Sequence, residues 1–324
     1  MPTHALLIAN PVARGRPGRW VARAVERLRA GGLEVEARLT ARRGDAQEWA
    51  REAAARGVAL VAVMGGDGTV NEAVNAIAAT PTALGMIPTG ACNVTAMELG
   101  IPRGVEAACD VVLRGRVETV PVGRIQLLEG PAPFGQWPSI GAGGALDETA
   151  SRMTVAKESL FLMMAGAGFD ADAVARVNLK WKTIIGKGAY YAAALQAFLR
   201  YRAPWITVGF DAGDTAVGRA VVVSNIRTYG GPFPMAPGGD LRQPYFNVCV
   251  FQLARRWELL RILAALPFGR HVRLPGVIFT KARSVTLMAP PGAVPIQTDG
   301  DFLGFAPAKI EIIPGALRLC TPSL

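Results

Sequence analysis

Apolar residues in the first third of the chain form short strand-like runs that alternate with segments of helical spacing. The strand-like runs lie at residues 5–10, 33–40, 58–65 and 84–88, and the helical segments at 18–32, 44–57 and 70–79. Continuous apolar strands separated by helices are typical of a parallel sheet that helices cover on both faces. The pattern therefore predicts an N-terminal α/β domain with a parallel sheet.

After about residue 120 the pattern changes to strand-like segments separated by Gly, Pro and Asp turns. These segments lie at residues 116–128, 159–168, 206–213, 216–226, 246–253 and 283–290. The second part of the chain is therefore predicted to be a mostly antiparallel β domain. Two segments of helical spacing with basic ends interrupt it at 183–202 and 255–269, and the Gly/Pro-rich stretch 130–144 is expected to be a mobile loop.

The composition fits a folded protein of two domains. The chain has 324 residues, of which 51% are hydrophobic and 19% charged. Its net charge of +10 favours an anionic partner such as a nucleotide, a nucleic acid or an acidic lipid surface, although solubility explains the same charge. The four scattered cysteines indicate neither a zinc site nor a redox pair and favour a cytoplasmic location. No apolar run reaches the ~20 residues of a membrane-spanning helix, so any membrane contact is expected to be peripheral.

A glycine-rich loop follows the run at 58–65 and opens the next helical segment. It reads Gly65, Gly66, Asp67, Gly68 and Thr69. Glycines permit positive φ and a close approach to a ligand, and the free N–H groups of a helix start favour an anion. An aspartate beside a phosphate implies a cation between them, so Asp67 is expected to serve Mg²⁺ rather than packing. A tight turn capped by Asp67 or Thr69 is the simpler alternative, but three glycines in four positions exceed what a cap requires.

Two further loops are expected at the same edge of the predicted sheet. The loop at 10–19 contains Asn10 with interleaved glycines and arginines, and the loop at 87–93 places Gly90 and Asn93 before a helix. Open α/β sheets bind ligands at the carboxyl ends of their strands. A solvated arginine face explains the first loop equally well when it is taken alone. The convergence of three loops on one edge favours a phosphate-binding site.

Two common nucleotide motifs are not supported. No G-x-x-x-x-G-K-[ST] sequence is present, which excludes a P-loop at the level of sequence. Residues 166–174 imitate a dinucleotide fingerprint, but no suitable acidic residue follows about 20 positions later.

Taken together, the motifs resemble the diacylglycerol kinase catalytic family, a group of bacterial lipid kinases with relatives among the sphingosine kinases. The resemblance rests on "NPVARGRPG", on Thr40 followed by "GDA", and on "GGDGTVNEAVN", "PTGACN", "AMELGIP", "GAGFDA", "SNIRTYGGPFPMAP" and "TDGD". These motifs run in family order from about residue 5 to residue 305. The glycine loop alone is less specific, because NAD kinases and phosphofructokinases share it.

The resemblance implies a nucleotide-binding domain of residues 1–121, to which 306–324 return, and a lipid-binding β-sandwich of residues 122–305. The active site would lie in the cleft between them. It implies an ATP-dependent kinase that uses Mg²⁺ and phosphorylates a lipid hydroxyl, foremost that of diacylglycerol to give phosphatidic acid. Asp67 would hold the metal, and Asp301 would act as the general base in place of the glutamate of the family's DGE motif. The expected ATP contacts are Asn10, Thr40, Gly65, Gly66, Asp67, Gly68, Thr69, Val70, Asn71, Gly90 and Asn93.

The chain departs from the family pattern at three places. Ala91 replaces a threonine that contacts ATP, so one hydrogen bond is expected to be lost. Asp301 is one methylene shorter than glutamate, and "TDGD" without the family reads as a hairpin turn of the D-G type. Gln243 and Pro244 replace the Asp-Gly of a structural magnesium site, so no metal is expected there.

Partners and alternative functions follow from the basic surface and from these departures. Basic residues on or beside the two helical segments of the second domain favour a cytoplasmic protein that docks peripherally on an anionic membrane, although a solvated basic face is equally consistent. They are Lys180, Lys182, Lys187, Arg255, Arg256, Arg261, Arg270 and Arg273. Nucleic acid is not an expected partner, and the choice between a monomer and a homodimer stays open. The alternative functions are a soluble NAD-type kinase and a nucleotide-binding regulator that has lost catalysis.

Overall fold

The structure is a computed structural model, and it divides the chain into two compact units. It describes residues 3–11, 17–130, 150, 152–169, 171, 204–211, 213–231, 233–253 and 256–323. Unit 1 comprises Met1–Val122, Thr228–Gly231 and Ile313–Leu324, and unit 2 comprises Gly123–Arg227 and Pro232–Ile312. The expected helix at 183–202 and, apart from Gly130, the expected mobile loop at 130–144 lie outside the described residues.

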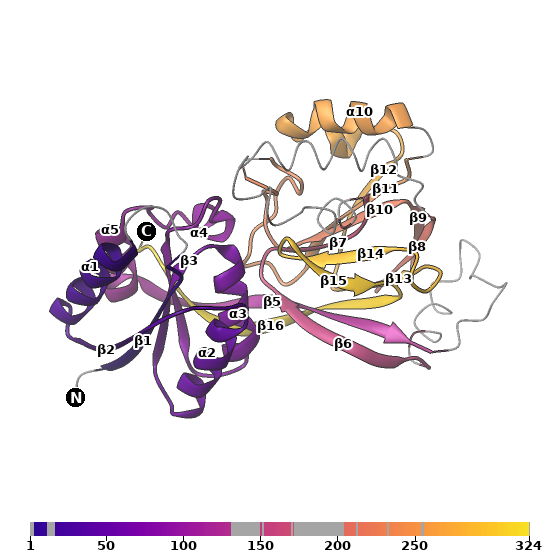
Figure 1. The fold of residues 1–324 in the computed structure, drawn as a ribbon. Coiled ribbons are helices and arrows are strands. Elements are labelled where there is room, and N and C mark those ends of the chain that lie inside the picture. The colour runs from indigo at the N-terminus through magenta and orange to yellow at the C-terminus, as the bar shows by residue number, and fades with distance from the viewer. Residues whose placement is uncertain are drawn as a thin grey trace. The chain divides into compact units, whose positions relative to one another are not determined.

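Unit 1 is an α/β domain, shown in indigo and purple in Figure 1. Its strands and helices are β1 (Thr3–Ala9), α1 (Pro17–Ala30), β2 (Leu33–Leu39), α2 (Asp45–Ala55), β3 (Leu60–Gly65), α3 (Asp67–Ile77), β4 (Ala83–Pro88), α4 (Val94–Glu98) and α5 (Val105–Arg114). The four strands pair in parallel in the order β2-β1-β3-β4. Every residue of β3 and β4 is buried, as expected for continuous apolar runs. The predicted parallel α/β fold is confirmed.

Four of the helices of unit 1 pack in two pairs, α1 with α5 and α2 with α3. The first turn of α3 begins at Asp67, so the glycine-rich loop is itself part of the helix start. α5 is a helix that the pattern above does not predict. Its buried positions Val105, Ala108, Cys109 and Val112 nevertheless have helical spacing.

Unit 2 is an antiparallel β-sandwich. Its strands are β5 (Arg116–Glu129), β6 (Thr154–Phe161), β7 (Met164–Gly168), β8 (Ile206–Phe210), β9 (Thr215–Gly218), β10 (Ala220–Ser224), β11 (Phe246–Phe251), β12 (Val277–Ala282), β13 (Ser284–Met288), β14 (Pro295–Thr298), β15 (Asp301–Phe305) and β16 (Ala308–Thr321), of which β5 and β16 extend into unit 1. One sheet has the order β12-β11-β10-β7-β14-β15, and β16, β13, β8 and β9 are neighbours in the other. The predicted antiparallel β-sandwich is confirmed.

The core of unit 2 lies between these two sheets. Phe161 of β6 stacks on Phe246 of β11 with a ring-centroid distance of 5.7 Å, and both side chains are fully buried. Val285 of β13 belongs to the same buried cluster. The predicted helix at 255–269 is observed as α10 (Arg256–Ala265), followed by the 3₁₀ turns η1 (Leu266–Phe268) and η2 (His271–Arg273). Among the described residues, no helix has both the length and the apolar character needed to cross a membrane.

The C-terminal strand β16 completes unit 1. Arg318 and Leu319 pair in parallel with β4, while residues 308–311 pair with β13 in unit 2. The end of β16 passes close to Gly115, where α5 ends. A Cβ on Gly115 would lie 2.3 Å from the carbonyl oxygens of both Thr321 and Val111. Glycine is therefore required at this position so that the last strand can reach its place.

We predict that Gly115→Ala lowers the unfolding temperature of unit 1. A methyl group there overlaps two backbone oxygens, which no rotamer change relieves, so we expect a loss of about 1–3 kcal/mol. The matched control is Gly18→Ala in α1, where a Cβ would meet nothing within 4 Å. Calorimetry should show a lower melting temperature for the first variant and an unchanged or slightly raised one for the second. Equal melting temperatures would contradict this role of Gly115.

Candidate active site

The loops that follow β1, β3 and β4 are joined by hydrogen bonds at the carboxyl edge of the parallel sheet. Asn10 donates from its backbone N–H to the carbonyl of Met64 (2.9 Å) and from Nδ2 to the hydroxyl of Thr69 (3.3 Å). The carbonyl of Gly65 accepts three bonds, from the N–H of Thr89 (3.0 Å), the N–H of Gly90 (3.1 Å) and Nδ2 of Asn93 (2.8 Å). The described parts of the three loops therefore meet as expected.

The two glycine loops touch backbone to backbone. A Cβ on Gly90 would lie 2.5 Å from Cα of Gly66 and 3.0 Å from Oδ1 of Asn93. A Cβ on Gly65 would lie 3.0 Å from the Thr69 side chain. Of the two properties for which glycine is suited, positive φ is not used here, since Gly66 has a φ of −102° and neither Gly65 nor Gly90 has a positive φ. Their role is close approach. Gly68 differs, because it is exposed and a Cβ on it would meet nothing within 4 Å.

Asp67 is half-buried at the start of α3 and connects two loops. Its carboxylate accepts hydrogen bonds from the N–H groups of Val94 (3.1 Å) and Thr95 (3.3 Å). Burial raises the pKa of Asp67, and these N–H groups partly oppose that effect. Asp67 was expected to bind a metal and to have no structural role. The second expectation is wrong, because the side chain holds α4 to the glycine loop.

The residues at this edge fit a magnesium ion that arrives with its nucleotide. Within the described part of the chain, no group of three or more His, Cys, Asp and Glu side chains could hold a metal by itself. Mg²⁺ commonly binds through one or two carboxylates together with substrate phosphates and water. Asp67 would supply one carboxylate, and a bound cation would favour its charged form.

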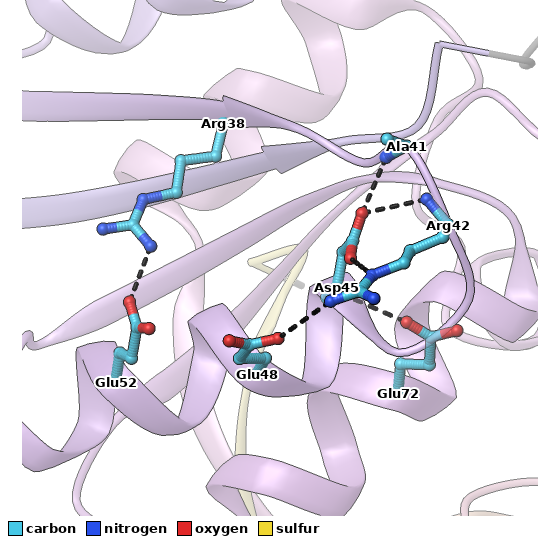
Figure 2. Close-up of polar contacts among 8 residues, drawn as sticks. Arg38, Ala41, Arg42, Asp45, Glu48, Glu52 and Glu72 are labelled. Carbon is cyan, nitrogen blue, oxygen red and sulfur yellow. Dashed lines mark hydrogen bonds and ion pairs between the residues drawn. The ribbon is translucent and has the colours of Figure 1, made fainter.

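The loop after β2 is fixed by Asp45 (Figure 2). Its buried carboxylate accepts bonds from the N–H groups of Ala41 (2.7 Å) and Arg42 (2.9 Å) and from Nε of Arg42 (3.1 Å). These bonds, first that of the Arg42 N–H, lower the pKa of Asp45. Thr40 lies just before this turn and donates its N–H to the carbonyl of Ala9 (2.9 Å). The end of β2 is thereby held beside the end of β1.

Glu72 ties this loop to the helix of the glycine motif. It lies on α3 and accepts a bond from the N–H of Ala46 at the start of α2 (3.2 Å), as Figure 2 shows. Asp45 and Glu72 both stand within motifs that the sequence singles out, but their roles as loop anchors are not evident from the sequence. No periodicity marks them, because any residue can supply the N–H group that they bind.

The remaining predicted ATP contacts lie in the same region. Val70 and Asn71 are buried in α3, and Asn71 Oδ1 accepts a bond from Nδ2 of Asn75 (3.0 Å). Ala91 is exposed in the loop after β4. Oγ1 of Thr89, two residues earlier, is buried without a hydrogen-bond partner in the described structure. A buried polar atom without a partner is typical of a site completed by a ligand or by water.

In unit 2, Asp299 anchors the hairpin that carries Asp301. Asp299 and Gly300 have φ values of 49° and 84° and lie between the paired residues Thr298 and Asp301. This is the expected two-residue turn of the D-G type. The buried Asp299 carboxylate accepts three bonds, from the N–H groups of Leu162 (2.8 Å), Met163 (2.9 Å) and Met164 (2.9 Å). Asp299 is therefore more than a turn residue.

Asn225, from the motif at 224–237, binds to the same segment. Its N–H donates to the carbonyl of Met163 (2.8 Å), and its Nδ2 donates to that of Leu162 (3.2 Å). Oδ1 of Asn225 is buried and has no hydrogen-bond partner among the described residues. Asn225, the segment at the start of β7 and the "TDGD" turn thus converge within unit 2. Sequence reasoning assigned no role to Asn225.

Asp301 is the first residue of β15, which is an edge strand of its sheet. The residue is half-buried. The turn that precedes it is held by Asp299 and by a bond from the N–H of Gly300 to Oε1 of Gln297 (2.8 Å). A carboxylate carried on such an anchored turn has the fixed position that a general base needs.

Comparisons with known proteins agree with this arrangement. The family profile of the diacylglycerol kinase catalytic domain matches residues 4–125, and that of the YegS C-terminal NAD kinase beta sandwich-like domain matches residues 163–321. A solved structure of a diacylglycerol kinase from Bacillus anthracis str. Sterne has the same fold, with a TM-score of 0.72 at 22% identity over 98% of this chain and 97% of the other.

Curated relatives match along nearly the whole chain. A diacylglycerol kinase of Bacillus subtilis is 28% identical over 313 residues, which cover 94% of this chain and 92% of the relative. A diacylglycerol kinase of Mycobacterium tuberculosis is 30% identical over 303 residues, which cover 92% of this chain and 88% of the relative. With these matches and the loop geometry above, the chain belongs to the diacylglycerol kinase catalytic family, a family of kinases.

Proposed function

We propose that this protein is an ATP-dependent lipid kinase that phosphorylates the hydroxyl group of diacylglycerol and so produces phosphatidic acid. The observation that supports it most is the glycine-to-glycine contact between the loops after β3 and β4, in a chain of this family. The names of the curated relatives support diacylglycerol as the acceptor.

The loops of unit 1 would bind the nucleotide. The start of α3 offers backbone N–H groups to the phosphates, and the exposed face of Gly68 leaves room for them. Asp67 would hold Mg²⁺, which when bound neutralises charge on the transferred phosphoryl group. Asn10, Thr40 and Thr69 bring polar groups to the same edge, and Gly90 and Asn93 close it.

Asp301 would act on the acceptor. The lipid hydroxyl oxygen forms a bond to the γ-phosphorus, the bond from that phosphorus to the β-γ bridging oxygen breaks, and ADP leaves. The hydroxyl proton passes to the Asp301 carboxylate, which acts as general base. Asp299 and Asn225 would fix its position through the turn and through residues 162–164. A nucleotide-binding regulator without catalysis would keep the nucleotide-binding loops of unit 1 and would lack a working general base at Asp301.

We predict that Asp301→Asn retains ATP binding and loses lipid phosphorylation by about 10²-fold or more, because an amide cannot accept the proton. Asp301→Glu should be active, because the longer side chain remains a base. The measurements are ATP titration calorimetry and transfer of radiolabelled phosphate from ATP to diacylglycerol vesicles and to extracted bacterial lipids, with the product identified by mass spectrometry. Lipid turnover by Asp301→Asn at the wild-type rate would exclude this base. A wild-type protein that binds ATP without phosphorylating lipid, and that Asp301→Glu does not rescue, would indicate the regulator.

The neighbouring variant Asp299→Asn is the control for the hairpin. It replaces a charged acceptor of three backbone N–H groups by an amide, so we expect a loss of about 2–4 kcal/mol of unfolding free energy. At low temperature, where the variant is folded, turnover should stay within about tenfold of wild type. Unchanged stability together with lost turnover would move the role of base to Asp299.

We predict that Asp67→Asn abolishes Mg-ATP-dependent turnover, by about 10²-fold or more, because a neutral amide is a poor ligand for Mg²⁺. It should also lower the melting temperature, since the N–H groups of Val94 and Thr95 lose a charged acceptor. Glu72→Gln is the matched control on the same helix. It should lower the melting temperature and leave Mg-ATP-dependent turnover unchanged. Full activity of Asp67→Asn at saturating Mg²⁺ would remove Asp67 from the site.

The raised pKa of Asp67 gives the direction of a pH effect. In the nucleotide-free protein the Asp67 carboxylate takes up a proton at a higher pH than an ordinary aspartate does. A protonated carboxyl group does not bind a cation. The Mg²⁺ concentration for half-maximal ATP binding should therefore rise on acidification, and the rise should begin at a higher pH than for an ordinary aspartate. Titrations at a series of pH values measure it, and a constant Mg²⁺ requirement would show that Asp67 does not bind the ion.

A further inference from the structure

Helix α10 carries apolar side chains on a buried face and also on exposed faces. Leu259 and Ile262 are buried. On other sides of the helix, Trp257 is 46% exposed, Leu260 55% and Leu263 47%. In the next turn, η1, Phe268 is 74% exposed. A surface helix of a soluble domain normally has a polar outer face, so this outer face needs a partner.

The exposed apolar side chains alternate with arginines. The guanidinium group of Arg261 lies 5.1 Å from the ring centre of Trp257, and that of Arg270 lies 5.9 Å from the ring centre of Phe268. Both arginines are exposed, and neither forms an ion pair with an acidic side chain of the described residues. Glu258 is the one acidic residue between positions 255 and 273 of the sequence, which contain five arginines. The surface therefore combines apolar groups with positive charge.

The position of this surface is fixed by His271. The imidazole ring is fully buried, its Nε2 lies 2.9 Å from the carbonyl oxygen of Met235, and it stacks on Phe251 with a centroid distance of 6.3 Å. His271 begins η2, directly after Arg270, so the chain between α10 and β12 is attached to the sheet. Figure 1 shows α10 outside the six-stranded sheet, beside β12.

We propose that Trp257, Leu260, Leu263 and Phe268, together with Arg261 and Arg270, form a docking face for an anionic lipid bilayer. Aromatic and leucine side chains beside arginines are typical of helices that lie in the membrane interface, where the apolar groups enter the acyl boundary and the guanidinium groups bind the headgroups. This inference goes beyond the proposed kinase activity and depends only on the contacts of the docking face.

A second copy of the chain fits this docking face poorly. A symmetric dimer would place Arg261 and Arg270 of one copy near the same arginines of the other, and like charges repel. Four exposed apolar side chains also supply less than the ~800 Å² per partner that a standard stable interface buries. An anionic bilayer offers negatively charged headgroups to the arginines and acyl chains to the apolar side chains. Of the basic residues expected at a membrane, Lys180, Lys182, Lys187 and Arg255 lie outside the described residues, and the side chain of Arg256 is not described.

The test is flotation of the full-length protein with vesicles in the absence of ATP and of diacylglycerol, so that its outcome is independent of the proposed kinase activity. One set of vesicles contains phosphatidylcholine with phosphatidylglycerol, and the other contains phosphatidylcholine alone. The variant Trp257→Ser/Leu260→Ser/Phe268→Ser should lower the partition coefficient on anionic vesicles by about tenfold or more. Arg261→Glu/Arg270→Glu should lower it by at least roughly fivefold per arginine and should have little effect on neutral vesicles.

Two matched variants control for the loss of exposed apolar area and of charge elsewhere. Leu39→Ser/Val117→Ser/Val155→Ser removes three exposed apolar side chains that belong to other elements, β2, β5 and β6. Lys281→Glu/Arg283→Glu reverses two exposed charges at the far end of β12. Both should bind anionic vesicles within about threefold of wild type.

Three results would overturn the docking face. The first is flotation of the docking-face variants at the wild-type level. The second is an equal loss in the control variants, which would show a general effect of apolarity or charge. The third is sedimentation equilibrium showing a wild-type dimer that the serine variant converts to a monomer with unchanged flotation, which would make the face a subunit interface. The arginine variant changes only exposed side chains and keeps the test decisive if the serine variant does not fold.

Discussion

The contact between the backbones of Gly66 and Gly90 is the constraint on which the candidate nucleotide site depends. It leaves no room for a Cβ on Gly90, and it brings the loop after β4 close enough for the carbonyl of Gly65 to accept three hydrogen bonds from it. Only at this distance can the Asp67 carboxylate reach the N–H groups at the start of α4. The loops after β3 and β4 are thereby one structure, fixed before any ligand binds. A site that is fixed in advance does not have to reorganise when charge develops during phosphoryl transfer.

Aspartate carboxylates connect distant segments in both units. Asp299 binds three backbone N–H groups that lie more than 130 residues earlier in the chain. A buried carboxylate is costly unless hydrogen bonds compensate its desolvation, and Asp45 and Asp299 each accept three. Asp67 accepts two from the loop after β4, and burial still raises its pKa. Of the three, it is therefore the carboxylate whose charged form would gain most from an added cation.

The sequence predicted the elements whose signal is local. Continuous apolar runs indicated β3 and β4, and helical spacing indicated α1, α2 and α10. The meeting of three loops followed from the rule that parallel strands end at one edge. The anchoring roles of Asp45, Glu72 and Asp299 could not be predicted, because their partners are backbone N–H groups that every residue except proline supplies. The glycine motif was interpreted through positive φ and through close approach to a ligand. The structure shows close approach, between the two glycine loops themselves, and sequence alone cannot separate the two reasons because both require glycine.

Helix α10 shows where periodicity alone cannot decide between two environments. A segment with apolar residues on more than one side is consistent with a helix in a protein core and with one between a protein and a membrane. The three-dimensional structure separates the two, because Leu259 is buried whereas Leu260, the next residue, is 55% exposed. If the docking face binds a bilayer, unit 1 would bind the water-soluble substrate and unit 2 the membrane-bound one. In that case the polar loops of unit 1 would take the proposed nucleotide from water, and unit 2 would meet the proposed lipid acceptor in the membrane. A kinase built in this way need not extract its substrate fully from the bilayer.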